Sequence, residues 1–311
     1  MSLGVAIVGF GSAGRQHADA LDDHPHAHVT KVLELDPTVD VGGLPRAAAW
    51  ADLLDDSDVQ LVALCTPPGD RAALAIEALS SGRSVLLEKP PAMSMAELTT
   101  IDDAARRSGG CAGVMLQHRW RLPNDLDIDA WRRPEVTGVL EVFRYRPGSH
   151  YQKAGWRTSV DEALGGITAH LGVHYLDLAC TVLGDVLTVD LAPARCAGPG
   201  IDTRVSGWLS FASGATLAFT ISAESTIRRE RLSIVAPDRA LTVVDGEVEV
   251  DVAGTATRHK PLDVTSLRRA VYSDVAAAVA AGRQPERSGL AGARAVTQVL
   301  EHVRDRQVGP A

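Results

Sequence analysis

The fold is decided near the N-terminus, by the stretch VAIVGFGSAG at residues 5–14. Four apolar residues predict a buried strand, and glycines 9, 11 and 14 follow it directly and open a helical pattern. Such a junction needs glycine where the chain turns tightly, where backbone approaches a bound group closely, and where helix packs on strand. The N–H groups at a helix N-terminus attract negative charge. We therefore expect this turn to hold the pyrophosphate of a dinucleotide through Gly9, Gly11, Ser12, Ala13 and Gly14. The alternative is a tight helix–strand junction without a ligand.

The second apolar run, VTKVLELDP at residues 29–37, ends in two acidic side chains. Glu34 and Asp36 lie about 20 residues past the last glycine, where a carboxylate accepts the ribose hydroxyls of NAD. We expect Glu34 first and Asp36 second in this role, against the alternative of solvated charges at a strand end. No Arg or Lys occurs between Glu34 and Arg46. The missing cation favours NAD over NADP, whose 2′-phosphate needs a positive partner.

The first third of the chain continues as short apolar runs alternating with helical patterns, which predicts a parallel sheet covered on both faces. ALCTPPGDR, at residues 63–71, leaves the third strand at the carboxyl edge of that sheet, where a cofactor lies in this fold. Thr66, Pro67 and Pro68 are therefore assigned to the cofactor site, although prolines there also simply end a strand.

VLLEKPPAM, at residues 85–93, places Glu88 and Lys89 at the same carboxyl edge. An ammonium group in a partly desolvated cleft can hold a hydroxyl and stabilise negative charge that develops on its oxygen. We expect Lys89 to do this beside the cofactor, with Glu88 orienting it and Pro90 fixing the turn, and we assign Glu88 and Lys89 to the cofactor-binding residues as well.

After about residue 118 the pattern changes to alternating polar and apolar residues separated by glycine-containing turns. The sequence thus predicts an α/β domain at 1–118, followed at 119–311 by an α+β domain with a large, mostly antiparallel open sheet. Long helices are expected at 161–183, 264–281 and 289–306.

The stretch GGITAHLGVHYLDL, at residues 165–178, puts His170, His174 and Asp177 at spacings of four and three, on one face of a helix. Oxidising a secondary alcohol requires removal of its hydroxyl proton, and imidazole suits this at neutral pH. His174 is the candidate base. Three alternatives stand beside this interpretation: His170 and His174 as a metal pair, His174 as a hydrogen-bonded core residue, and Asp177 as a structural partner.

Taken together, these motifs resemble the Gfo/Idh/MocA family of nicotinamide-dependent oxidoreductases. The likeness rests on GFGSAG and on three longer stretches in the family's order, CTPPGDRAALAIEALSSGRSVLLEKP, WRTSVDEALGGITAHLGVHYLDLACTVLG and GRQPERSGLAGARAVTQVLE. The resemblance implies that Lys89 of E-K-P is catalytic and that His174 of G-x-H-x-x-D is the acid or base. His170 stands where members often carry Asp, and it joins the expected catalytic and substrate-binding group. Members of the family often carry a histidine after a T-P-N motif, and Arg71 replaces this histidine. Pro68 replaces the asparagine of the same motif.

Within the family, VMLQHRWRLP, LDPTVDVGG and GGITAHLGVH are most similar to the WlbA-type dehydrogenases, which oxidise nucleotide-linked amino-sugar uronates. Arginine recognises carboxylate or phosphate bidentately, and Trp offers a flat face to sugar C–H groups. The predicted substrate contacts, besides His170, His174 and Asp177, are Arg119, Arg121, Tyr151, Trp156 and Arg157. Core packing or surface ion pairs are the alternative for each of these.

Composition narrows the partners. The chain has 311 residues, 45% of them hydrophobic, and a net charge of −8, which disfavours nucleic acid and anionic membrane as partners. The four scattered cysteines are typical of reduced thiols, and no export signal is recognised, so a cytoplasmic location is expected. No metal is predicted. The alternating strands carry apolar residues on both faces, which predicts a homodimer or homotetramer through the C-terminal sheet.

The sequence therefore predicts an NAD-dependent oxidoreductase that transfers a hydride between nicotinamide and a secondary hydroxyl of a sugar, polyol or sugar derivative. Two other classes stay open. One is a cofactor-binding regulator or sensor that has lost catalysis, and the other is an enzyme that uses hydride transfer transiently for elimination or hydrolysis.

Overall fold

The computed structural model describes residues 2–147, 149–150, 164–198 and 200–308, and it divides into two units. The first unit comprises Met1–Gln117 together with Asp263–Ala293, and the second comprises His118–Leu262 together with Arg294–Ala311. The predicted boundary between residues 118 and 119 therefore leaves out one feature. The chain comes back to the first unit at Asp263–Ala293, which contains a late helix. Local periodicity predicts that helix but does not identify its packing partner.

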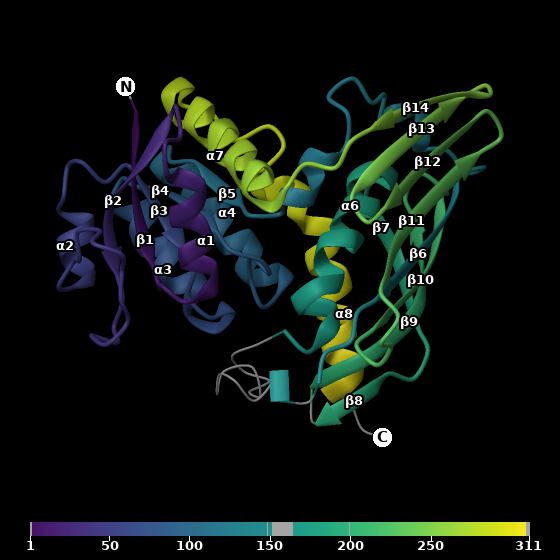
Figure 1. Ribbon diagram of the computed structural model, residues 1–311, viewed down its shortest axis with the longest axis horizontal. Helices are drawn as coiled ribbons and strands as arrows, with labels where there is room; N and C mark the ends of the chain where they lie inside the picture. The colour runs from purple at the N-terminus through teal and green to yellow at the C-terminus, as the bar shows by residue number, and fades with distance from the viewer. Residues whose placement is uncertain (1, 148, 151–163, 199, 309–311) are drawn as a thin grey trace. The chain divides into compact units, whose positions relative to one another are not determined.

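The first unit contains a five-stranded parallel sheet in the order β2-β1-β3-β4-β5 (Figure 1). The strands are β1 (Leu3–Val8), β2 (Ala27–Leu33), β3 (Leu61–Leu64), β4 (Ser84–Leu87) and β5 (Ala112–Val114). Strands β1, β3, β4 and β5 are buried along their whole length, as expected for a sheet covered on both faces. The strand order reverses between β1 and β3, so this is the point where ligands bind in such sheets.

Helices cover both faces of this sheet (Figure 1). They are α1 (Ser12–Leu21), α2 (Trp50–Leu54), α3 (Pro68–Ser80), α4 (Met95–Ser108) and α7 (Val264–Ala281), followed by the 3₁₀ turn η5 (Leu290–Ala293). Helix α7 packs against α1, and α3 packs against α4. Ser94 begins α4 by accepting a hydrogen bond from the Glu97 N–H, and Asp263 begins α7 in the same way with Ser266.

The second unit contains a nine-stranded sheet, ordered β14-β13-β12-β11-β6-β10-β9-β7 with β8 paired to β9 (Figure 1). The strands are β6 (Thr137–Phe143), β7 (Val186–Leu191), β8 (Arg195–Gly198), β9 (Ile201–Phe211), β10 (Thr216–Ser222), β11 (Arg229–Ala236), β12 (Arg239–Val244), β13 (Glu247–Val252) and β14 (Thr255–His259). The predicted combination of an α/β and an α+β fold is confirmed. One pair, β6 with β10, is parallel, because the chain crosses over between them through a helix and three strands.

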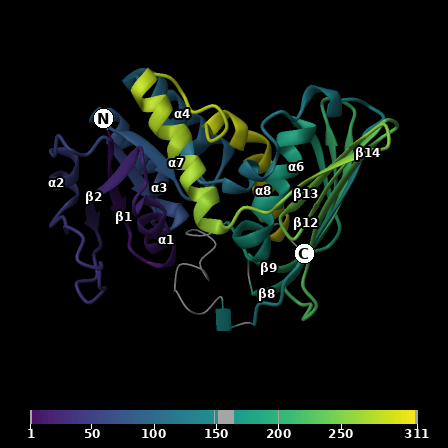
Figure 2. The same ribbon diagram turned by 45° about the horizontal axis from the view of Figure 1, so that its top comes forward.

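Helices α6 (Val173–Leu183) and α8 (Arg294–Val308) lie along one face of that sheet (Figure 2). Shorter 3₁₀ turns are η1 (Gln117–Arg121) and η2 (Asp129–Trp131). Helix α6 is preceded by one π-helical turn, η4 (Thr168–Gly172), instead of the uniform α-helix predicted over 161–183. Residues 161–163 of that prediction lie outside the described residues.

None of the helices in the described residues is both long enough and apolar enough to cross a bilayer.

Candidate functional site

The three glycines in the turn after β1 have different structural roles. Gly9 has a φ of +85°, which favours glycine, and a Cβ on Gly14 would lie 2.2 Å from the Gly9 carbonyl oxygen. A Cβ on Gly11 would meet no described atom within 4 Å. Gly9 and Gly14 are therefore required by the turn itself, whereas Gly11 leaves open space in front of the α1 N-terminus, and Ser12 begins the helix.

Glu34 lies beside this turn at the end of β2. Its Oε2 accepts a hydrogen bond from the Phe10 N–H at 2.6 Å, and its Oε1 accepts one from the Asp36 N–H at 3.0 Å. Asp36 is exposed and caps its own turn, because its Oδ1 accepts from the Thr38 N–H and hydroxyl, which lowers the pKa of Asp36. A carboxylate oxygen has a second lone pair, so Glu34 can hold the turn and still accept a ribose hydroxyl.

Two arginines approach the loop after β2, although no Arg or Lys stands between Glu34 and Arg46 in the sequence. Arg46 folds back onto the loop after β2, where its Nη1 donates to the carbonyls of Glu34 at 3.1 Å and Asp36 at 3.3 Å. Arg15 lies over the Phe10 ring, 5.2 Å from its centroid, and donates to the Asp40 carbonyl. Arg46 ends the interval that was expected to hold no cation, and Arg15 comes from the earlier helix α1. Within the first unit, Glu34 is the residue that favours NAD over NADP.

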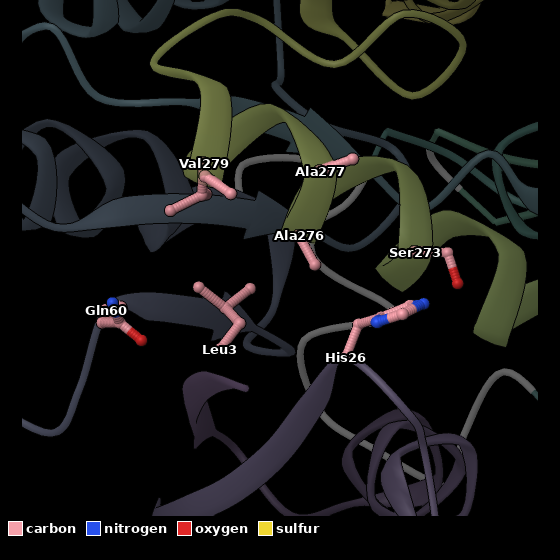
Figure 3. A pocket seen from close by; sticks show the side chains of 8 residues that line it. Leu3, His26, Gln60, Ser273, Ala276, Ala277 and Val279 are labelled. Atoms are coloured by element: carbon pink, nitrogen blue, oxygen red, sulfur yellow. The ribbon is translucent and has the colours of Figure 1, made fainter. Parts of the chain in front are cut away.

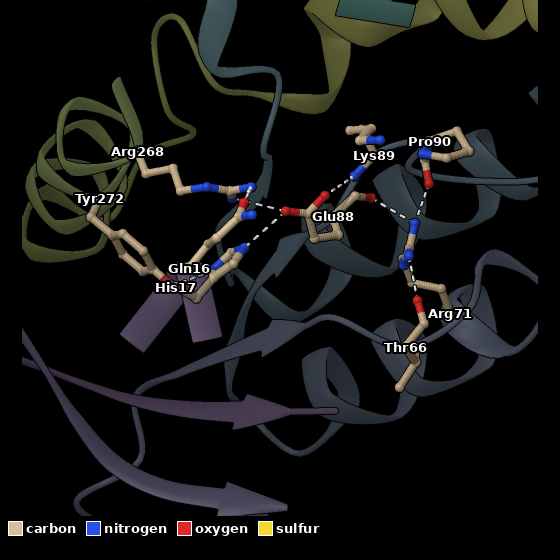
Figure 4. A network of polar contacts seen from close by, with 9 residues as sticks. All are labelled: Gln16, His17, Thr66, Arg71, Glu88, Lys89, Pro90, Arg268 and Tyr272. Atoms are coloured by element: carbon tan, nitrogen blue, oxygen red, sulfur yellow. Dashed lines mark hydrogen bonds and ion pairs between the residues drawn. The ribbon is translucent and has the colours of Figure 1, made fainter. Parts of the chain in front are cut away.

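Glu88 is the centre of a buried polar network (Figure 4). Its Oε1 lies 2.8 Å from Nη1 of Arg268 and 3.1 Å from Nε2 of His17, whose Nδ1 lies 2.6 Å from the Tyr272 hydroxyl. Burial alone would raise the pKa of Glu88, but the Arg268 guanidinium and the His17 hydrogen bond hold it well below its ordinary value. The network joins α1, the end of β4 and α7 within the first unit.

Lys89 is positioned through its main chain. Oε2 of Glu88 accepts a hydrogen bond from the Lys89 N–H at 3.0 Å, and the Lys89–Pro90 bond is cis. Glu88 therefore orients the backbone of Lys89, as the sequence predicted in general terms. The Lys89 side chain is partly exposed and emerges at the carboxyl edge of the sheet.

Arg71 supports the same loop from below (Figure 4). Its guanidinium donates to three carbonyls, those of Glu88, Pro90 and Thr66, and is buried against them. Burial lowers the pKa of Arg71 to about 10, although the Glu88 carboxylate opposes this. Arg71 thus joins the loops after β3 and β4.

Thr66, Pro67 and Pro68 lie between β3 and α3. Pro67 is the residue before the helix and Pro68 its first residue, a position that tolerates a missing N–H. The Thr66 hydroxyl is buried and has no hydrogen-bond partner among the described residues. A bound dinucleotide could occupy the open space at Gly11 and supply a hydrogen-bond partner for the Thr66 hydroxyl. The residues present therefore suit the predicted cofactor.

His174 is the second residue of α6, in the second unit, and is buried. Its ring stacks on His118, with centroids 4.6 Å apart, and His118 meets Tyr175 edge-on at 5.1 Å. His170 lies in the π-helical turn, with its ring 6.3 Å from that of His150. The structure thus gives the two histidines different neighbours, although the sequence predicted one shared helical face.

Arg119 and Asp177 form a buried pair. Arg119 Nε and Nη2 donate to the two carboxylate oxygens of Asp177 at 2.8 and 2.6 Å, and the two side chains are 3% and 0% exposed. This is the structural role that was the alternative for both residues, and their expected contacts with substrate stay a prediction. The expected contacts Tyr151, Trp156 and Arg157 lie outside the described residues.

A separate pocket of about 530 Å³ lies elsewhere in the first unit (Figure 3). Leu3, His26 and Gln60, which line it, stand at or before the amino ends of β1, β2 and β3, and residues 273–280 of α7 complete it. Because cofactors bind at the carboxyl ends of such strands, this pocket is not the cofactor site.

Sequence reasoning did not find His17, Arg71, Arg268 or His118 as parts of the site. His17 carried a usable signal, since a histidine three residues after the last glycine lies on the buried face of α1. Arg268 carried none, because its partner Glu88 is 180 residues earlier in the chain.

A Rossmann unit with an open glycine turn and a carboxylate at the end of β2 defines a dinucleotide-binding protein. Residues 3–116 match the family model described as an oxidoreductase family with an NAD-binding Rossmann fold, and residues 135–258 match the GFO/IDH/MocA C-terminal domain. The chain belongs to the Gfo/Idh/MocA oxidoreductase family.

Curated relatives are similar over parts of the chain. A proposed UDP-kanosamine synthase oxidoreductase subunit from Amycolatopsis mediterranei is 32% identical over 196 residues, covering 59% of this chain and 52% of the relative. The chain thus spans about half the length of that relative. A 1,5-anhydro-D-fructose reductase from Ensifer adhaerens is 26% identical over 278 residues, covering 84% of this chain and 81% of the relative.

Solved structures share the fold. Levoglucosan dehydrogenase in complex with NADH and levoglucosan superimposes with a TM-score of 0.86 at 17% identity, covering 99% of this chain and 97% of the other. A WlbA dehydrogenase from Chromobacterium violaceum in complex with NADH and UDP-GlcNAcA gives 0.80 at 20% identity, with 98% and 94% covered.

Proposed function

We propose that this chain is an NAD-dependent oxidoreductase that transfers a hydride between nicotinamide and a secondary hydroxyl of a sugar or sugar derivative. The observation that carries the proposal is in the first unit. An open glycine turn and a lysine fixed by a buried glutamate stand at the same edge of one parallel sheet. The names of the relatives, which include a sugar reductase and a sugar dehydrogenase, support the substrate class.

Each residue then has one task. The α1 N-terminus and Gly11 receive the pyrophosphate, and Glu34 accepts the ribose hydroxyls. Lys89 donates to the reacting hydroxyl and stabilises the negative charge on its oxygen, and His174 takes the hydroxyl proton. NAD, when bound, supplies the hydride acceptor.

Two variants test the catalytic assignment. Lys89→Ala and His174→Ala are expected to lower kcat by a factor of about 100 or more, the scale of one acid–base or electrostatic contribution. NADH absorbance measures turnover, and NADH binding serves as the control for His174→Ala, since His174 is not among the expected cofactor contacts. Unchanged turnover in either variant refutes its role, and binding of NAD without turnover of any sugar supports a sensor instead.

The cofactor assignment has its own matched pair. Gly11→Ala is expected to weaken NADH binding about tenfold or more while leaving the free energy of unfolding within about 0.5 kcal/mol, because its Cβ meets only open space. Gly14→Ala is expected to destabilise the fold, because its Cβ would meet the Gly9 carbonyl. Calorimetric titration and urea unfolding distinguish the two, and normal NADH affinity of Gly11→Ala would contradict the site.

We further propose that the helix-free face of the nine-stranded sheet joins two copies of the chain. Val139, Trp208 and Val235 are 52%, 43% and 48% exposed, and Ala218 lies between Trp208 and Val139 in the register. Light scattering should show a dimer or tetramer, and Trp208→Glu should dissociate it. A monomeric native chain at micromolar concentration would rule this interface out.

A further inference from the structure

A second buried glutamate, Glu230 on β11, lies in the second unit with arginines around it. Its Oε2 accepts from the Tyr175 hydroxyl at 2.6 Å and from Nη2 of Arg228 at 2.8 Å, and its Oε1 is 3.2 Å from Nε of Arg144. Burial alone would raise the pKa of Glu230, but the hydrogen bonds from Tyr175 and Arg228 outweigh this effect. The pKa of Glu230 therefore lies below its ordinary value, and the carboxylate is charged at neutral pH. We call Arg121, Arg144 and Arg228 the guanidinium cluster.

Arg121 belongs to this cluster by electrostatics. It donates to the Gly246 carbonyl at 3.3 Å and interacts with the charge of Glu230. Partial burial lowers the pKa of Arg121, and its Nε is buried without a hydrogen-bond partner among the described residues. Burying a cation that has an unpaired N–H donor costs free energy, unless an anion pairs with the cation and accepts that hydrogen bond.

Positive charge is in excess here, although the whole chain carries −8. Arg144 and Arg228 pair with the carboxylate of Glu230, Arg228 Nε also lies 3.9 Å from that of Asp245, and Arg121 interacts with the charge of Glu230, so three guanidinium groups stand against two carboxylates. One arginine is enough to pair a buried carboxylate. The Arg144 and Arg228 side chains are still 30% and 55% exposed, so a ligand in solvent can reach both side chains.

The cluster is continuous with the candidate base. Glu230 pairs with Val142 in the register of β11 and β6, and Arg228 and Arg144 lie just beyond the ends of these two strands, where their guanidinium groups contact the Glu230 carboxylate. Tyr175 follows His174 in α6, and His118 contacts both rings. A chain of direct contacts therefore runs from His174 through His118 and Tyr175 to Glu230.

We propose that the guanidinium cluster binds an anionic group of the substrate, a carboxylate or a phosphate, so that the enzyme acts on acidic sugars or sugar phosphate esters. Guanidinium groups bind both anions through paired N–H···O bonds. Glu230 holds the arginines in place, and the excess charge is left for the ligand. This inference rests on the proposed function, because it names the substrate class of the same site.

Calorimetric titration of the NADH-loaded protein tests it with three probes. D-glucuronate carries a carboxylate, D-glucose 1-phosphate carries a phosphate, and D-glucose carries neither. We expect one or both anions to bind at least tenfold more tightly than glucose, and the stronger one identifies the source of the charge. Raising the salt concentration should reduce that preference, since exposed charges are screened.

Variants locate the effect. Arg144→Met and Arg228→Met should each reduce the preference for the anion about fivefold or more, the scale of a lost charged hydrogen bond. Arg258→Met is the matched control, because Arg258 is an exposed arginine paired with Glu249 on a neighbouring strand of the same sheet. Its preference should equal that of the native chain.

The outcomes separate the two proposals. Equal or tighter binding of glucose, no binding of either anion, or a preference that survives both arginine substitutions overturns the anion site. Selective anion binding without any reduction of NAD leaves the anion site standing and refutes the proposed reaction.

Discussion

Two buried glutamates, one in each unit, have similar partners and opposite surroundings. Glu88 contacts an arginine and a histidine that are 6% and 0% exposed, and the histidine in turn contacts a tyrosine. Glu230 contacts a tyrosine and two arginines, which are 30% and 55% exposed. The first carboxylate is enclosed by protein, whereas the second is open to solvent on its arginine side.

The difference teaches what a buried charge is used for in each place. In the enclosed network, Arg268 and the Lys89 N–H donate hydrogen bonds to the Glu88 carboxylate, and this fixes the backbone at Lys89. In the open cluster the carboxylate aligns arginines whose remaining donors face outward, so the result is a surface that can bind an anion.

The largest expected effect separates the two glutamates by stability. Arg268→Met should lower the free energy of unfolding by about 3 kcal/mol, because Glu88 would keep a buried charge without its main partner. Arg228→Met should cost less than about 1 kcal/mol, because Arg228 is half exposed and Glu230 keeps Arg144 and Tyr175. Urea unfolding followed by circular dichroism measures both, and similar losses would remove the distinction.

The second expected effect concerns turnover. Glu88→Gln should lower kcat about tenfold with little change in KM, because the Lys89 backbone loses a charged acceptor and shifts. Arg144→Met should instead act mainly on KM for an anionic substrate. Steady-state kinetics with the best sugar gives both constants, and a pure KM effect of Glu88→Gln would show that the enclosed network does not position Lys89.

The third effect is a pH dependence of the enclosed network. Burial lowers the pKa of His17 below its ordinary value of 6.5, so the unfolded chain binds a proton there before the folded chain does. Stability from this site is therefore complete above pH 6.5 and is lost as the pH falls below it, by up to about 1.4 kcal/mol per pH unit. His17→Gln should remove this slope between about pH 7 and pH 5.5 in urea unfolding. His302→Gln, at an exposed site, should leave the slope unchanged.

The smallest effect is expected at the open cluster. Tyr175→Phe should lower the free energy of unfolding by about 0.5–1 kcal/mol, since Glu230 loses one of its donors and keeps two arginines. Tyr272→Phe should cost more, because the fully buried His17 loses its partner at Nδ1. Thermal unfolding ranks the pair, and the reverse order would mean that the second cluster is the more enclosed one.

What the sequence predicted well depends on neighbours in the chain. The glycine turn, Glu34 and the position of Lys89 at a strand end follow from short patterns whose physical cause is local. Helix α7 was predicted over the residues where it occurs, yet its place in the first unit was missed, because burial of an apolar face does not specify the partner. The parallel pair β6–β10 was missed for a similar reason, since alternation predicts strands without fixing their direction.

The same limit explains the errors at the site. Arg46 and Arg15 reach the loop after β2, although neither lies between Glu34 and Arg46 in the sequence. Arg119 and Asp177, which each suited a ligand by residue type, satisfy one another across 58 residues. Ionic pairs of this kind are set by tertiary packing, so residue type alone cannot separate a binding residue from a structural one.

The return of α7 to the first unit also bears on how the protein is made. On the ribosome, the strands β1–β5 emerge more than 150 residues before Arg268 and Tyr272. Until then the carboxylate of Glu88 has no guanidinium from α7, and the face of α1 that packs on α7 stays uncovered. The nucleotide-binding half is therefore a late product of synthesis, finished only after the whole nine-stranded sheet has left the exit tunnel.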